Sequence, residues 1–100
     1  MEVLAILVQR IAAACHAEEI WLFGSRARGD DLSDSDYDFL VVTHDGDPAR
    51  DESEAYRAVA DLGVGCDILA CCRRDFDAGR QDHMDIVARA IREGRRVYPA

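Results

Sequence analysis

Residues 24–42, GSRARGDDLSDSDYDFLVV, combine a Gly-Ser turn, a polar loop and two aspartates that precede an apolar run. The segment before them, IWLF at 20–23, has the length and composition of a short buried strand. Gly24 can adopt backbone conformations that other residues resist, and Ser25 is a favourable residue at a helix start. The stretch therefore predicts a strand, a tight turn with a helix start, and a second strand over residues 37–42.

The turn at Gly24 and Ser25 has the features of a phosphate-binding site. Backbone N–H groups at a helix start, together with the Ser25 hydroxyl, can donate hydrogen bonds to phosphate oxygens. Arg26 and Arg28 follow closely enough in sequence to add positive charge. A P-loop is excluded, because that motif requires a lysine and the chain contains none. We therefore predict a different kind of phosphate site at these four residues.

Asp36 and Asp38 point to the same side of the predicted second strand, because side chains on a strand alternate between its faces. Tyr37 and Phe39 then point to the other side. Two neighbouring carboxylates repel each other unless a cation or a proton lies between them. Mg²⁺ is commonly bound by one or two carboxylates together with substrate phosphates. The pair of aspartates therefore predicts a metal site.

Asp67 lies in VGCDILAC at 64–71, an otherwise apolar segment that predicts a buried strand. An acid is rarely buried without a partner. A strand, helix, strand path would place this segment beside the strand that carries Asp36 and Asp38. On that prediction, the three carboxylates form one cluster.

The Gly24-Ser25 pair, ten intervening residues, the aspartates at 36 and 38, and the later Asp67 resemble the minimal nucleotidyltransferase family. These proteins are small relatives of the DNA polymerase beta-like superfamily. The resemblance covers nearly the whole chain. It implies that Gly24 and Ser25 bind a nucleotide triphosphate, that Asp36 and Asp38 bind Mg²⁺, and that Asp67 helps to activate the attacking hydroxyl. Because Asp67 is predicted to complete the carboxylate cluster, we also expect it at the metal.

The resemblance also implies the fold and the partner. The expected fold is α/β (α+β), with residues 1–100 forming one small domain in which helices flank a mixed sheet. Stand-alone domains of this family resemble the antitoxin of two-gene systems whose toxin is a HEPN ribonuclease. This resemblance implies transfer of AMP from ATP to a tyrosine of the toxin. Two other functions stay open: a non-catalytic antitoxin that acts by binding, and a small-molecule nucleotidyltransferase whose acceptor site comes from a partner.

The acidic residues also allow other interpretations. Asp34, Asp36 and Asp38 could begin a calcium-binding EF-hand loop, but that loop needs glycine at its sixth position and glutamate at its twelfth. Phe39 and Asp45 occupy those positions here. A strand edge that simply faces water is the plain alternative for the aspartates at 36 and 38. The acids in the preceding loop are interpreted as solvated: Asp30, Asp31 and Asp34.

The four cysteines are interpreted as reduced core residues. Cys15 lies on a predicted helix, whereas Cys66, Cys71 and Cys72 lie in or beside an apolar segment, where small buried thiols are common. Zinc binding by the last three and a histidine is the alternative, but their spacing matches none of the usual paired patterns.

The formal net charge of −8 argues against a long nucleic acid as substrate, because binding of a phosphate backbone depends on clusters of Arg and Lys. No apolar run approaches the length that spans a bilayer, and Glu2 stands where a signal peptide would be basic. We therefore expect a cytoplasmic protein.

The remaining elements follow from periodicity and caps. A first helix is indicated by apolar residues at helical spacing, namely Val3, Leu4, Leu7, Val8, Ile11 and Cys15. A second helix should begin at Asp47-Pro48 and run to about Leu62. A last helix over Asp82–Arg92 should end at Gly94 and precede a short strand over Arg95–Tyr98. The apolar side of that last helix is predicted to consist of Met84, Ile86, Val87, Ala90 and Ile91.

Overall fold

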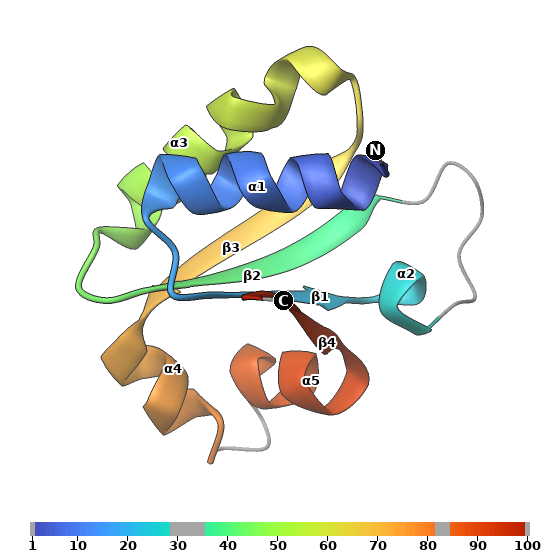
Figure 1. Ribbon diagram of the computed structural model, residues 1–100. Coiled ribbons are helices and arrows are strands. Elements are labelled where there is room, and N and C mark those ends of the chain that lie inside the picture. Colours follow the sequence, from blue (N-terminus) through green and yellow to red (C-terminus); the bar gives the residue numbers. More distant parts are fainter. Residues whose placement is uncertain (1, 29–35, 82–84, 100) are drawn as a thin grey trace.

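A four-stranded sheet lies between two pairs of helices in the computed structural model, which describes residues 2–28, 36–81 and 85–99 (Figure 1). In chain order, the elements are α1 (Val3–Cys15), β1 (Glu19–Phe23), α2 (Ser25–Arg28), β2 (Tyr37–Thr43), α3 (Pro48–Val59), the 3-10 turn η1 (Ala60–Leu62), β3 (Cys66–Cys72), α4 (Arg73–Gly79), α5 (Ile86–Glu93) and β4 (Arg95–Tyr98).

The strand order is β3-β2-β1-β4. β1 pairs antiparallel with both β2 and β4, whereas β2 and β3 are parallel. Parallel neighbours need a crossover connection, and α3 with η1 supplies it between β2 and β3. The mixed sheet with flanking helices confirms the predicted fold class, and the strand, helix, strand path confirms the predicted adjacency of β2 and β3.

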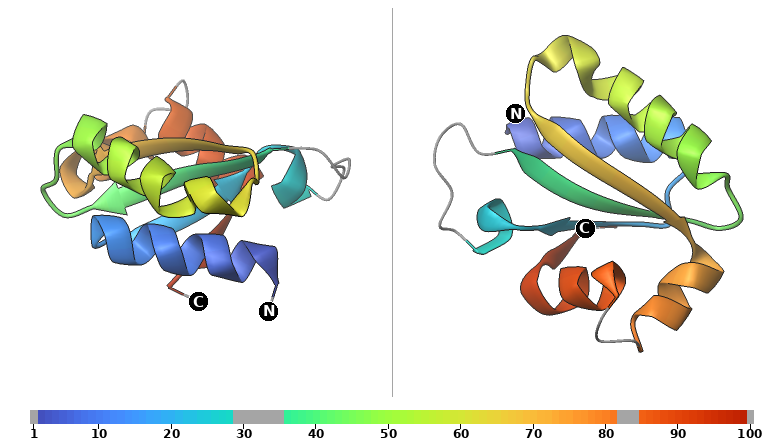
Figure 2. Two further views of the ribbon diagram at one scale, coloured as in Figure 1. Left: turned by 90° about the horizontal axis from the view of Figure 1, so that it is seen from above. Right: turned by 180° about the vertical axis from the view of Figure 1, so that it is seen from behind.

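Each face of the sheet has its own core. α1 and α3 cover one face, over buried side chains that include Ile20, Phe39, Val41 and Ile68 (Figure 1 and Figure 2). α4 and α5 lie on the other face, where Phe76 packs with side chains of β2. Alternate side chains of β2 therefore pack into the two cores, as expected for a central strand.

The predicted first helix is confirmed as α1, whose spacing buries Leu7, Val8 and Ile11 on one stripe. Val3 was assigned to the same stripe, but it is 43% exposed. It is the first residue of the helix, at the end where no described neighbour covers it.

α3 begins where the sequence predicted, because Asp47 caps it and Pro48 occupies its first turn. The Asp47 carboxylate accepts a hydrogen bond from the backbone N–H of Ala49 at 3.1 Å. The regular helix ends at Val59, and the chain continues to Leu62 as the 3-10 turn. The predicted end at Leu62 thus corresponds to the end of the combined segment.

We expect Asp47→Ala to lower the free energy of unfolding by about 1 kcal/mol, because it removes this cap. For a domain of this size, that loss lowers the melting temperature by roughly 4–8 °C in a thermal melt followed by circular dichroism. Asp47→Ser keeps a capping oxygen and should melt within a degree or two of the native protein. An Asp47→Ala protein that melts like the native protein would contradict this role.

The segment around Asp67 was predicted to be a buried strand. The strand is confirmed as β3, but the prediction that it is buried is wrong. β3 is an edge strand, and Ile68 is its only buried residue. Leu69 is 42% exposed. An edge strand with one covered face can keep the apolar composition of a central strand, and this explains the error.

The C-terminal half differs from the sequence prediction in its helices. α4 was not predicted, because Phe76 is its one large apolar residue and gives no periodic pattern. The last helix, expected from Asp82, begins at Ile86 after the capping residue Asp85, and residues 82–84 lie outside the described parts of the chain. Ile86 is 40% exposed instead of buried, because it occupies the first turn. The stop at Gly94 and the final strand are confirmed.

The sequence predicted that the cysteines are reduced, and it contained no apolar run long enough to span a bilayer. All four cysteines are free thiols. No described helix combines the length and the apolar character that crossing a membrane would demand.

Candidate active site

Asp38 and Asp67 lie opposite each other on neighbouring strands. In the parallel register of β2 and β3, Tyr37 pairs with Cys66, Asp38 with Asp67, and Phe39 with Ile68. Phe39 and Ile68 belong to the core under α1 and α3, so the two aspartates share the other face. Asp38 is partly buried and Asp67 is exposed. The two carboxylates therefore flank a surface that water and ligands can reach.

Asp67 was expected to need a partner because it would be buried. The structure corrects this reason, since the Asp67 side chain is exposed. Its position opposite Asp38 follows from the strand register alone.

Asp36 lies against Gly65, at the point where β2 and β3 begin. The backbone N–H of Tyr37 donates a hydrogen bond to the Gly65 carbonyl at 3.0 Å. A Cβ atom added at Gly65 would overlap Oδ1 of Asp36. Gly65 thus leaves room for the first carboxylate beside the backbone, a role that the sequence did not reveal. Gly65 lies one residue before β3 begins. This position could have indicated its role, but only once the register of β2 and β3 was known.

Asp38 lies against Gly24 in the same way. Phe23, the last residue of β1, pairs with Asp38, and Gly24 follows with a positive φ of 76°. A Cβ atom added at Gly24 would overlap Oδ2 of Asp38. Glycine is therefore required here for two reasons: the left-handed backbone and the close approach of the carboxylate. The predicted turn at Gly24, with a helix start at Ser25, is present as the junction of β1 and α2.

The negative charges of Asp36 and Asp67 both affect the pKa of the Cys66 thiol. Burial raises the pKa of the Cys66 thiol, and the negative charges of Asp36 and Asp67 raise it further. Because Cys66 pairs with Tyr37, which lies between Asp36 and Asp38 in the sequence, this effect is expected if the acids gather at one end of the strand pair. The Cys66 thiol stays protonated at neutral pH and is a poor nucleophile.

The donor atoms suit Mg²⁺, which prefers carboxylate oxygens. Within residues 2–28, 36–81 and 85–99, however, no three acidic, histidine or cysteine side chains are drawn together closely enough to hold a metal ion. Carboxylates repel one another, and here Asp36 lies beside Gly65 while Asp38 lies beside Gly24. The residues fit the ion in their chemistry and in the strands that carry them, but their side chains are not arranged as a ligand cluster.

Of the two predicted phosphate-binding arginines, the structure describes the side chain of Arg26. Its guanidinium lies over the Tyr37 ring, 4.1 Å from the centroid, and Tyr37 in turn stacks on Phe39 at 6.1 Å. Tyr37 and Phe39 belong to the face opposite Asp38, and a phosphate-binding role for Arg26 stays a prediction. Ser25 and Arg28 are part of α2, but their side chains lie outside the described parts of the chain, as do Asp30, Asp31 and Asp34.

The chain also resembles known proteins. A family model described as a nucleotidyltransferase domain matches residues 1–91. The chain belongs to this nucleotidyltransferase family. No curated protein matches its sequence significantly.

Two solved structures are similar to this nucleotidyltransferase domain. One is a chain of a crystal structure described as a toxin–antitoxin with AMP-PNP, with a TM-score of 0.64 and 16% sequence identity over 94% of this chain and 72% of that chain. The other is from Sulfolobus solfataricus and was solved as a candidate nucleotidyltransferase, with a TM-score of 0.49 and 30% identity over 72% of this chain and 66% of that chain. The first similarity supports the fold.

Proposed function

We propose that this domain transfers a nucleotidyl group from ATP to an acceptor hydroxyl with the help of Mg²⁺. The observation that carries the proposal is the pairing of Asp38 with Asp67 on an exposed face, next to the Gly24 turn. Metal ions held by carboxylates stabilise the attacking and leaving oxygens in phosphoryl transfer, and backbone N–H groups at a helix start can bind phosphates. The Asp38–Asp67 pair and the Gly24 turn, which lie at one end of the sheet, support these two roles.

In the proposed reaction, the acceptor oxygen forms a bond to the α-phosphorus of ATP. The bond between the α-phosphorus and the bridging oxygen breaks, and pyrophosphate leaves with that electron pair. The proton of the acceptor hydroxyl passes to the Asp67 carboxylate and then to water. The exposed position of Asp67 on the edge strand supports this role, since a macromolecular acceptor can approach it there.

Asp36, Asp38 and Asp67 are the residues that would hold Mg²⁺. When bound, the ion would neutralise negative charge on the attacking and leaving oxygens. The backbone N–H groups that follow Gly24 would donate to the triphosphate, because they begin α2 directly after the glycine that contacts Asp38.

The proposed acceptor is a tyrosine of a HEPN ribonuclease toxin, which makes the domain an antitoxin that modifies its partner with AMP. Two features support this step. The fold resembles a chain from a toxin–antitoxin structure that contains AMP-PNP, an ATP analogue. In addition, Asp67 is exposed on the edge strand β3, where a tyrosine of a partner protein can approach it.

A second candidate is an antitoxin that neutralises its partner by binding alone. The observation in its favour is that the described acidic side chains are not gathered into a metal-binding cluster. Such a protein would keep the fold and the exposed surface of β3 but transfer nothing.

The deciding experiment is mass spectrometry of the product of the adjacent gene after incubation with this protein, ATP and Mg²⁺. Addition of one AMP to a tyrosine supports the proposal. A tight complex without added mass supports the binding-only antitoxin and contradicts transfer to this partner. If the partner is neither modified nor bound, the toxin–antitoxin proposal is wrong, and the small-molecule acceptor becomes the next candidate.

A further inference from the structure

The two edge strands of the sheet, β3 and β4, differ in whether side chains occupy their free backbone N–H groups. On the β3 edge, the backbone N–H of Ile68 donates to the Tyr56 hydroxyl at 2.8 Å, and the N–H of Ala70 donates to Glu52 Oε2 at 2.9 Å. Both acceptors come from α3. These two N–H groups are the donors that an added strand would use, so side chains of α3 block strand addition at this edge.

The β4 edge has no such cover within the described chain. β4 pairs with β1 on one side, and no described strand lies on its other side. Among residues 2–28, 36–81 and 85–99, no side chain of another element forms a hydrogen bond with the β4 backbone, in contrast to β3. An edge strand in this condition is a ready template for another extended chain.

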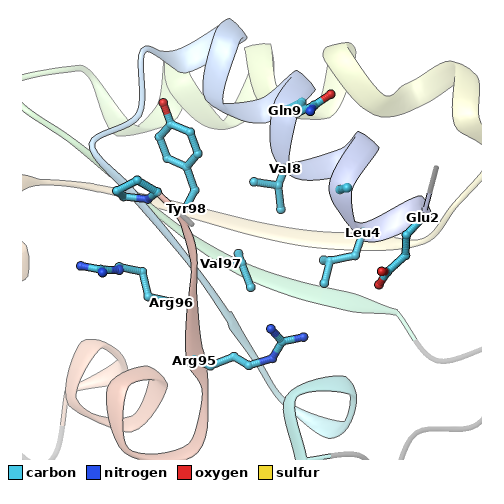
Figure 3. A pocket seen from close by; sticks show the side chains of 10 residues that line it. Glu2, Leu4, Val8, Gln9, Arg95, Arg96, Val97 and Tyr98 are labelled. Carbon is cyan, nitrogen blue, oxygen red and sulfur yellow. The ribbon is translucent and has the colours of Figure 1, made fainter.

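A groove runs beside this edge, between β4 and the N-terminal half of α1 (Figure 3). Its volume is about 500 Å³, and Leu4, Val8 and Val97 supply apolar lining. Figure 3 shows these three side chains along the groove, with Arg95 and Arg96 on the strand side and Glu2 at its end. The combination offers apolar contact for alternate side chains of a bound strand.

The charge at this edge is opposite to the charge of the whole protein. The chain has a formal net charge of −8, yet β4 begins with two exposed arginines, Arg95 and Arg96. Neither of them forms an ion pair with a described residue. Arg96 does act at a distance on Glu19, whose ion pair is with Arg73. Glu2 is the one acidic side chain that lines the groove. The edge therefore has positive charge available for a partner.

We propose that the β4 edge binds an extended, acidic segment of a partner protein by strand addition. Backbone hydrogen bonds would join the segment to β4, and its apolar side chains would lie in the groove on one face of the strand. Arg95 and Arg96 are successive residues, so they lie on opposite faces of β4. The alternating acidic side chains would meet Arg96, and an acidic residue at the end of the segment would meet Arg95 beside the groove. This interface is distinct from the aspartates at the end of β2. The proposal does not depend on nucleotidyl transfer.

Two other occupants fit less well. A second copy that paired through its own β4 would bring like charges together, because Arg95 and Arg96 of both copies would meet across a symmetric contact. A nucleic acid would find two arginines at this edge within a strongly acidic protein, and phosphate binding requires larger basic clusters. An acidic polypeptide can form ion pairs with the arginines and backbone hydrogen bonds with the outer side of β4.

The test is titration of the isotope-labelled protein, residues 1–100, with a synthetic peptide that alternates glutamate and valine. Amide shifts recorded by NMR should change at Arg95–Tyr98 and along α1, and should change little at β3. The double variant Arg95→Glu/Arg96→Glu should raise Kd at least about tenfold. Arg74→Glu/Arg80→Glu, on α4 and at its C-terminal cap, makes the same change of charge away from the groove and should leave Kd within about twofold of the native value.

Two further peptides separate the contributions. A peptide methylated on alternate backbone nitrogens should bind at least about tenfold more weakly, because it cannot complete the strand hydrogen bonds. A peptide that alternates lysine and valine should not bind. Each of the following results would overturn the proposal: no binding of the acidic peptide, shifts that map to β3, equal binding of the lysine peptide, tighter binding of single-stranded RNA, or self-association through β4 in sedimentation.

Discussion

Asp38→Asn is expected to lower AMP transfer about a thousand-fold or more while the fold is retained. The substitution removes a negative charge at the reacting phosphate but changes the side-chain volume little. Asp38 is flanked by Gly24 on one side and by Asp67 on the neighbouring strand, so the change acts at the centre of the proposed site. Transfer is measured with radiolabelled ATP and the partner protein at saturating Mg²⁺.

Asp45→Asn is the matched control. It makes the same chemical change on an exposed residue just beyond the opposite end of β2. This variant should transfer AMP at the native rate. Circular dichroism should show equal melting temperatures for the two variants within a few degrees. If Asp38→Asn remains folded and transfers AMP at the native rate, the carboxylate has no part in the reaction.

Asp67→Asn tests the pairing of the two strands. Because Asp67 lies opposite Asp38, a comparable loss of transfer is expected from it. The partner should still bind this variant, since the substitution changes one exposed side chain. Retained binding with lost transfer would separate the catalytic proposal from the binding-only antitoxin.

The local elements could be predicted from the sequence where one signal dominates. α1 follows from its apolar stripe, and α3 follows from the Asp47 cap with the adjacent proline. β2 follows from a run of aromatic and β-branched residues. In these segments, propensity and the tertiary structure favour the same conformation.

Other features depend on contacts between distant segments. β3 has the composition of a central strand, and only the sheet order reveals that it lies at an edge. α4 depends on burial of Phe76 beneath the sheet and on ion pairs from Arg73 to Glu18 and Glu19, none of which leaves a periodic pattern. Composition alone cannot distinguish a strand with two covered faces from a strand with one.

For the candidate site, the sequence identified residue types but not their neighbours. The aspartates were recognised by spacing, and the register places Asp38 beside Asp67. The contact of Arg26 with Tyr37 could not be foreseen, because it requires α2 to turn back toward β2. The same is true of Gly65, whose importance is visible only when Asp36 lies over it.

Gly24→Ala is expected to reduce AMP transfer at least about a hundred-fold, because the new methyl group would displace the Asp38 carboxylate. The backbone of Gly24 also has a positive φ of 76°, which costs an alanine about 1 kcal/mol. A simple activity loss could therefore arise from strain in the turn instead of displacement of the acid. The measurement must separate these two effects.

Gly63→Ala separates them. Gly63 has a similar φ of 65°, but a Cβ atom there would meet nothing within 4 Å. Both variants should lose about 1 kcal/mol of stability, or roughly 4–8 °C in melting temperature, whereas only Gly24→Ala should lose transfer. Equal activity of the two variants at matched stability would mean that contact between residue 24 and Asp38 is irrelevant to the reaction. Loss in Gly24→Ala alone would mean that glycine is needed at this turn because a catalytic carboxylate occupies the space of its missing side chain.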